Sequence, residues 1–503
     1  MIENNYKKRI AKNSIILYIR MLITLSVSLY TSRVVLNALG IENFGLFNVV
    51  AGVVVLFSFI NMSLSTASSR FINYELGKNN FEFQNLEIVF SSCLCVHLLL
   101  ALLIAFLCET IGLYLLYTQI QIADSRFDAA LCVYHLSVAS ICIGIIFAPF
   151  NAEVIAHERI DAFTYISITE VVGKLLIAFL LPIIYSDKLI AYAYLLLAMT
   201  ALVQGIYVLY CYKKFDECRR LRHPDRLLLK KIFTFTGWNL LGDAAYTSFS
   251  QGLNLLLNIF FGAAINAARG IAVQVNGIVL RLIQSFQTAV NPQIVQSYSS
   301  GDGNKMHDLI IMASRYTFYL MTVLAIPILF NIEFLLSIWL VDVPNYTGIF
   351  IQIMILISYF DALGYSMTVA INATGKNRNY QLIVSGTMLF ILPLSYLCLK
   401  FGYPPHAVFL CHLFIGFVAH ILRLLCVHKE IGLHILPYVK CIFIKGGIVV
   451  LLSSLGTHIV KQVVYDDNSW LTLIVSFLLT CSWVFLIGLN KRERAFLLNK
   501  LKR

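Results

Sequence analysis

Residues 87–108 read EIVFSSCLCVHLLLALLIAFLC, an apolar block whose acidic and basic side chains are limited to Glu87 and His97. A helix needs about 20 apolar residues to cross the hydrocarbon core of a bilayer, and this block supplies that length. Blocks of the same kind recur from one end of the chain to the other. They predict an all-α polytopic membrane protein.

The recurring blocks predict about fourteen transmembrane helices. Composition agrees, because 59% of the 503 residues are apolar and only 13% are charged, about half the roughly 25% usual in soluble domains. A water-soluble globule, a disordered chain, a disulfide-rich secreted fold and an outer-membrane barrel are all excluded on these grounds. The expected spans are 15–36, 46–65, 87–108, 129–150, 164–184, 190–210, 233–258, 270–291, 309–331, 347–372, 380–399, 407–427, 441–460 and 470–489.

The positions of lysine and arginine predict the orientation. With the N-terminus in the cytoplasm, 26 of these residues fall in the cytoplasmic segments and 5 in the outer loops, while the rest lie within spans. This imbalance follows the positive-inside rule, so both termini are expected in the cytoplasm. The most basic segment, 211–231, is expected to anchor the topology by contacting anionic membrane lipids.

Weak internal similarity predicts two related six-helix bundles around a central lumen. At an offset of 222, Leu39-Gly40 falls on Phe261-Gly262 and Thr66-Ala67 on Thr288-Ala289, and at 221 Asn151-Ala152 falls on Asn372-Ala373. A repeat of six spans keeps one orientation, so the axis relating the halves runs along the membrane normal. The expected parts are 1–210, the first bundle; 211–231, a basic cytoplasmic linker; 232–428, the second bundle; and 429–503, two additional helices with a basic tail.

Polar side chains form a stripe along each of two neighbouring spans. They recur every three or four residues in 239–258, NLLGDAAYTSFSQGLNLLLN, and in 274–291, QVNGIVLRLIQSFQTAVN. Unsatisfied polar groups are costly in lipid, so each stripe must face either a partner helix or a water-filled lumen. Helix contacts need only one or two such groups, and six per helix favour a lumen. The candidate lining residues are Asn239, Asn254, Asn258, Gln274 and Gln284.

Cations outnumber acids inside the predicted spans, which favours an anionic substrate. The candidate cations are Arg20, Arg33, Arg269 and Arg281; Arg315, Arg423 and Lys445 lie near span ends, where they can reach the membrane surface. Glu170 and Lys174 are expected to form a local ion pair.

Asp243 and Asp361 are candidate coupling or lumen acids. The repeat places Arg20 opposite Asp243, so these two are expected to face each other. Asp361 has two interpretations: a carboxylate that couples transport to H+ or Na+, or an acid satisfied by a neighbouring arginine or backbone group.

Several motifs are missing from the sequence. It has no phosphate-binding G-x-x-x-x-G-K-[ST] loop and no H-E-x-x-H, and its twelve cysteines contain no C-x-x-C pair. We therefore expect no enzyme activity, no cofactor and no metal site. The net charge of +12 comes from lysines and arginines that lie mostly in the predicted cytoplasmic segments, so it reflects membrane topology and does not indicate nucleic-acid binding.

The chain resembles bacterial Wzx-type polysaccharide flippases. In its opening the similar residues are Lys12-Asn13-Ser14, Leu39-Gly40 and Phe44-Gly45; farther along they are Ile338-Trp339-Leu340 and Asn372-Ala373-Thr374-Gly375-Lys376. These flippases share a superfamily with the multidrug and toxin extruders and the lipid II flippase. The predicted number of spans, fourteen, is that of the lipid II flippase, whereas the drug exporters have twelve.

The resemblance implies a function. It implies that the chain moves undecaprenyl-pyrophosphate-linked oligosaccharide repeat units across the bacterial inner membrane by alternating access, for O-antigen, capsule or exopolysaccharide assembly. It also implies association with the polysaccharide polymerase machinery. The alternative is a cation-coupled multidrug exporter of the same fold, although the surplus of interior cations argues against it. A membrane glycosyltransferase or polymerase would need acids or a metal site in its outer loops, and these loops are short.

Overall fold

The computed structural model describes residues 2–55, 58–78, 82–118, 124–184, 187–339, 343–463, 469–491 and 493–495. Every regular element in these ranges is a helix, which confirms the predicted all-α fold. The chain divides into two compact units. Unit 1 comprises Met1–Asp243 and Val295–Gly301, and unit 2 comprises Ala244–Ile294 and Asp302–Arg503.

Unit 1 is built from long apolar helices joined by short turns. The first of them contains Gly40, whose φ of 78° is not helical and marks a kink. The elements are α1 (Ile2–Val55), α2 (Ser58–Leu76), α3 (Phe83–Leu107), η1 (Cys108–Gly112), α4 (Leu113–Thr118), η2 (Asp124–Arg126), α5 (Phe127–Ala156), α6 (Ile160–Leu180), η3 (Leu181–Ile183), α7 (Lys188–Lys214) and η4 (Asp216–Cys218).

A buried histidine joins three helices in the core of unit 1. The ring of His97, on α3, lies 2.8 Å from Ser68 Oγ of α2 and 2.7 Å from the carbonyl oxygen of Ile145 on α5. The surrounding side chains are apolar and include Leu64 and Val133. Both ring nitrogens are therefore satisfied away from water, which is what a buried imidazole requires.

The basic linker is folded onto unit 1. The backbone N–H of Arg222 donates to Ser91 Oγ (3.0 Å), and its guanidinium forms an ion pair with the buried Glu87. Both partners lie on α3. Earlier in the linker, η4 places Glu217 against His157, the residue that caps the C-terminal end of α5. The segment predicted as a linker is thus tied at two points to the helices before it.

The longest helical element, α8 (Arg226–Ser299), contains both polar stripes. The Arg269 guanidinium donates to the carbonyl oxygen of Ser250 at 2.7 Å. These residues are 19 apart in sequence, which in a straight helix would separate them by about 28 Å. The chain therefore reverses between Ser250 and Arg269, as expected for two antiparallel spans.

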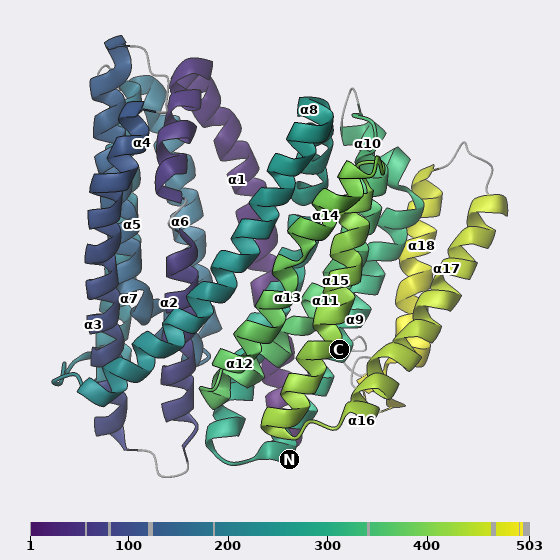
Figure 1. The fold of residues 1–503 in the computed structure, drawn as a ribbon. Helices are drawn as coiled ribbons and strands as arrows, with labels where there is room; N and C mark the ends of the chain where they lie inside the picture. The colour runs from purple at the N-terminus through teal and green to yellow at the C-terminus, as the bar shows by residue number, and fades with distance from the viewer. Residues whose placement is uncertain are drawn as a thin grey trace. The chain divides into compact units, whose positions relative to one another are not determined.

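Unit 2 continues with α9 (Gly303–Phe330), α10 (Ile332–Trp339), α11 (Thr347–Thr374), α12 (Arg378–Tyr380), η5 (Gln381–Ser385), α13 (Gly386–Leu389), α14 (Ile391–Lys400), α15 (Ala407–Ile431), α16 (Ile435–Val439), η6 (Lys440–Ile444), α17 (Lys445–Val463), α18 (Ser469–Trp483) and η8 (Val484–Gly488). Helix α11 packs against α9 and α15, while α17 and α18 lie side by side at the yellow end of the chain (Figure 1). Gly375, at φ 75°, ends α11 in the left-handed conformation that favours glycine.

Eleven helical stretches among the described residues are long and apolar enough to cross a membrane, and each coincides with a predicted span. The other three predicted spans, 46–65, 233–258 and 270–291, fall on α1 with α2 and on α8. The chain is therefore a multi-pass membrane protein, and the total of fourteen remains a prediction.

Candidate functional site

Arg20 is the best-anchored of the candidate cations. It lies on α1, and its Nη1 donates to Ser167 Oγ (3.3 Å) while its guanidinium carbon stands 4.5 Å from the ring centroid of Phe163. Both partners come from α6. The Nε atom is buried and has no hydrogen-bond partner. The guanidinium is therefore held in place on two sides, and one of its buried donors is unpaired.

Asp243 and Arg20 both belong to unit 1, but the contacts described for each are with different residues. The hydroxyl of Ser63 donates to the Asp243 carboxylate, whereas the contacts of Arg20 are with α6. Asn239, one turn before Asp243, is buried, and Arg33 on α1 is exposed. A direct pairing of Arg20 with Asp243 remains a prediction.

In unit 2 the second stripe meets α11 at a hydrogen bond. Gln284 Nε2 donates to the hydroxyl of Tyr365 at 2.9 Å. Tyr365 is one turn beyond Asp361 on the same helix, so these three side chains occupy one region of unit 2. An amide, a phenol and a carboxylate together offer both donors and acceptors for hydroxyl groups.

Arg423 of α15 enters the same region. Its Nε donates to the Tyr380 hydroxyl (2.9 Å) and its Nη1 to the carbonyl oxygen of Phe360 (3.3 Å). A Cβ atom at Gly364 would lie 2.0 Å from Arg423 Nη1, so glycine provides the space for the guanidinium. Both interpretations of Asp361 remain predictions.

The remaining candidates have fewer contacts. Arg269 is half-buried and donates a hydrogen bond to the carbonyl oxygen of Ser250. Gln274 and Arg281 are exposed and Asn254 is half-buried. The side chain of Asn258 lies outside the described residues. A lumen lined jointly by the two stripes therefore remains a prediction.

One ion pair expected from the sequence is present, and one arginine lies in a different place from the one expected. The ion pair of Lys174 with Glu170 is confirmed, with Nζ 2.6 Å from Oε1. Arg423 was expected near the membrane surface, but the structure bonds it to groups of α11 and α12. No signal in one sequence indicates that Gly364 leaves room for it.

A cluster of metal-ligating side chains was also missed. Glu153, His157 and Glu217 present ligand atoms within 4.8 Å of one another. The first two are spaced i,i+4, which places them on one helix face and is the only local trace of the cluster. The sequence predicted no metal site, and none of these three residues is among the predicted lumen residues.

Comparison with known proteins gives both a family and a fold. The family model described as "Polysaccharide biosynthesis protein" matches residues 10–298, more than half of the chain. A search of curated protein sequences found no match.

Solved structures match the chain over most of its length. A MATE crystal structure in complex with MaD3S is similar at TM-score 0.71 and 15% identity, covering 85% of this chain and 96% of that one. An outward-facing multidrug resistance MATE family transporter of the MOP superfamily gives TM-score 0.70 at 17% identity with the same coverage. A MOP superfamily transporter from Pyrococcus furiosus, described as having reversed binding-pocket polarity, gives 0.69 at 17%, again covering 85% and 96%. At these identities the likeness establishes the fold.

Proposed function

The chain belongs to the polysaccharide biosynthesis protein family, and from that premise we propose that it is a flippase for lipid-linked oligosaccharides. The substrate we propose is an undecaprenyl-pyrophosphate-linked repeat unit, moved from the cytoplasmic to the periplasmic leaflet of the inner membrane by alternating access. It would serve O-antigen, capsule or exopolysaccharide assembly next to the polysaccharide polymerase machinery.

The observation that carries this proposal is the state of Arg20. Its guanidinium is anchored by Phe163 and Ser167 and keeps a buried Nε without a partner. A pyrophosphate or a sugar carboxylate would satisfy that donor, because arginine offers a planar fork that matches oxyanions. Arg33, Arg269 and Arg281 would add positive charge along the path.

The sugar part of the substrate needs neutral donors and acceptors. The bonded pair of Gln284 and Tyr365 supplies both kinds of group in unit 2. Asn239, Asn254, Asn258 and Gln274 would supply more if the stripes line one lumen. Transport needs positions where hydroxyl groups exchange partners without a large cost, and amides and phenols serve that purpose.

A cation-coupled multidrug exporter is the alternative function, since the fold is shared with multidrug transporters. Such a protein would need an acid available to a cation. Asp243 accepts a hydrogen bond from Ser63, which partly satisfies this acid. Together with the surplus of cations inside the predicted spans, this favours the anionic substrate.

Complementation tests the proposal. In a strain lacking the gene, the wild type should restore surface polysaccharide, while Arg20→Ala and Arg281→Ala should leave lipid-linked repeat units on the inner leaflet. Arg219→Ala is the matched control, because it removes an equal charge at an exposed position paired with Asp216, outside the predicted lumen. All variants must reach the membrane in equal amounts.

Two outcomes would reject the flippase. If deletion leaves the polysaccharide and its lipid-linked precursor unchanged, the substrate is wrong. If deletion instead sensitises cells to toxic cations, the exporter replaces it, and Asp243→Asn and Asp361→Asn become the variants to test.

A further inference from the structure

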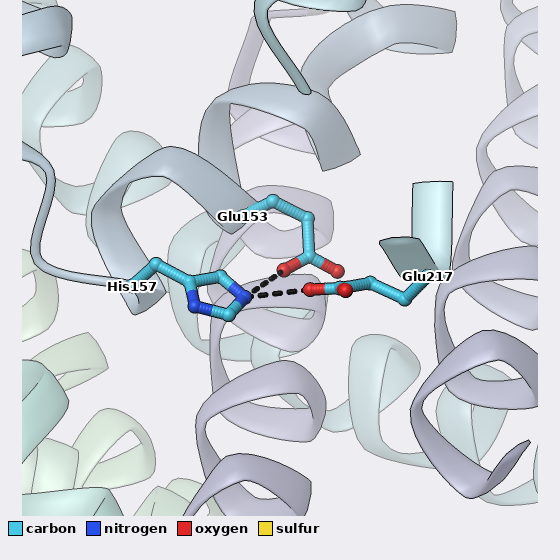
Figure 2. A group of neighbouring side chains, drawn as sticks. All are labelled: Glu153, His157 and Glu217. Carbon is cyan, nitrogen blue, oxygen red and sulfur yellow. Dashed lines mark hydrogen bonds and ion pairs between the residues drawn. The ribbon is translucent and has the colours of Figure 1, made fainter. Parts of the chain in front are cut away.

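Three side chains of unit 1 converge at the end of α5 (Figure 2). His157 Nε2 lies 2.6 Å from Glu217 Oε1 and 3.5 Å from Glu153 Oε2. Glu153 and His157 come from the last turn of α5 and its cap, and Glu217 comes from η4 in the basic linker. Figure 2 shows the imidazole nitrogen directed at both carboxylates.

The burial of Glu153 is the unexplained feature of this cluster. Its side chain is 0% exposed, and neither carboxylate oxygen accepts a hydrogen bond. Burying an ionised carboxylate without such partners is expensive. Glu217, also buried, adds a second acid to the same place. The two carboxylates together require a compensating charge that a single histidine cannot fully provide.

We propose that Glu153, His157 and Glu217 bind a divalent transition-metal cation, with Zn²⁺ the best-fitting one. A tetrahedral ion with bonds of about 2.05 Å separates its ligand atoms by about 3.4 Å. The His157–Glu153 separation already has this size, and the His157–Glu217 pair would open by less than 1 Å. A dication also neutralises the two carboxylates.

The donor types select among metals. An imidazole nitrogen suits zinc and its neighbours in the first row, whereas Mg²⁺ and Ca²⁺ prefer all-oxygen sites. The buried thiols of Cys211 and Cys218 belong to the same apolar cluster of unit 1 as Phe215 and Val154, the residue next to Glu153, and thiols also favour zinc. Phe215 stacks on the His157 ring at a centroid distance of 4.2 Å, which fixes the ring orientation.

Bound zinc would clasp α5 to the linker. Glu153 and His157 precede α6 and α7 in the sequence, and Glu217 follows them. The metal would therefore link two segments of unit 1 that are separated by these two helices. We assign this site the role of holding α5 and the linker together.

Zinc binding by the purified full-length protein in detergent tests the proposal. After chelator treatment and dialysis, the wild type should take up about one zinc per chain, measured by mass spectrometry and by competition with a chromophoric chelator. Glu217→Gln and His157→Gln should weaken binding by on the order of 100-fold or more, because each removes a direct ligand. Binding of Co²⁺ should give visible absorption bands that both variants lose.

His135→Gln is the matched control, since His135 also pairs with a glutamate, Glu109, at 3.0 Å but on an exposed surface of unit 1. It should bind zinc as the wild type does. Variants are compared only if their size-exclusion profiles match. The proposal is overturned if the wild type binds no zinc at micromolar concentrations, or if both ligand variants bind it unchanged. In either case the cluster is a hydrogen-bonded group that shares a proton.

Discussion

Replacing Gly364 with alanine should disturb unit 2 through one side chain, Arg423. The added Cβ would lie 2.0 Å from Arg423 Nη1 and 2.5 Å from Cζ. Both distances are far inside van der Waals contact, so the guanidinium must leave its position. In leaving, it gives up the hydrogen bonds to the Tyr380 hydroxyl and the Phe360 carbonyl.

The cost follows from those two bonds. Hydrogen bonds made by a charged group are worth about 1.5–3 kcal/mol each, and the lower figure applies because Arg423 is only half-buried, so the loss is about 3 kcal/mol. Alanine returns about 0.5–1 kcal/mol, since glycine is a poor residue for a helix interior. We expect Gly364→Ala to lower the free energy of unfolding by about 2 kcal/mol, or about 30-fold in the equilibrium constant.

Unfolding in mixed micelles of increasing denaturing detergent measures this difference. Gly416→Ala is the matched control, because it lies on α15, two turns before Arg423, and its added Cβ meets no atom within 4 Å. The control should be as stable as the wild type or slightly more stable.

A double-mutant cycle isolates the cause. In an Arg423→Met background there is no guanidinium to displace, so Gly364→Ala should cost less than about 0.5 kcal/mol there. Equal stability of Gly364→Ala and Gly416→Ala in the parent chain would refute the reasoning. An undiminished cost in the Arg423→Met background would refute it as well.

Three further predictions concern single contacts. Asp187 caps α7 and pairs with Arg126: burial raises its pKa, but the hydrogen bonds from Arg126 and two backbone N–H groups outweigh burial and hold the pKa below its ordinary value. The ionised Asp187 therefore stabilises the fold fully above about pH 4, and this contribution is lost as the pH falls through the folded-state pKa. Asp187→Asn should lower the free energy of unfolding by about 1 kcal/mol at neutral pH and by less in acid. Detergent unfolding at both pH values measures the difference. Glu493→Gln breaks the ion pair with Arg315, and trypsin should then cleave the segment after α18 several-fold faster. Gly77→Ala would place a Cβ about 2.5 Å from the backbone at the end of α8 and should cost about 2 kcal/mol, seen as a lower aggregation temperature.

Each of these has a matched comparison. Asp216→Asn removes an exposed acid with an i,i+3 partner, and its effect should be small at every pH. Gly205→Ala meets no atom within 4 Å, so its aggregation temperature should stay at the wild-type value. For Glu493, cleavage of the basic linker serves as the internal standard, because its rate should not change. A pH-independent effect of Asp187→Asn, an unchanged cleavage ratio, or equal aggregation temperatures would contradict the respective predictions.

The helices could be predicted because apolar length is a local property of the sequence. Their ends could not. The span predicted as 129–150 belongs to α5, which runs from Phe127 to Ala156. A hydropathy pattern marks only the apolar stretch, whereas the helix continues beyond it through polar residues such as Glu153. Glu153 lies in this continuation and His157 directly follows it, so the method that finds the span overlooks these two candidate zinc ligands.

The polar stripes could be predicted from their period, and their partners could not. The bond from Gln284 to Tyr365 joins residues 81 apart in sequence, and Arg423 reaches α11 only because Gly364 has no side chain. Such contacts depend on how helices pack in three dimensions. One sequence gives the chemistry available on each helix and leaves open which faces meet.

The attachment of the basic linker to unit 1 has a practical consequence for inserting foreign domains. By composition, residues 215–222 look like a replaceable tether in which a fluorescent domain or a cleavage site could be placed. An insertion there would take Arg222 away from the buried Glu87 and Glu217 away from His157. The turn at Gly301, which has a φ of 77°, is exposed. A reporter inserted at that turn should leave unit 1 folded, whereas one in the linker should not.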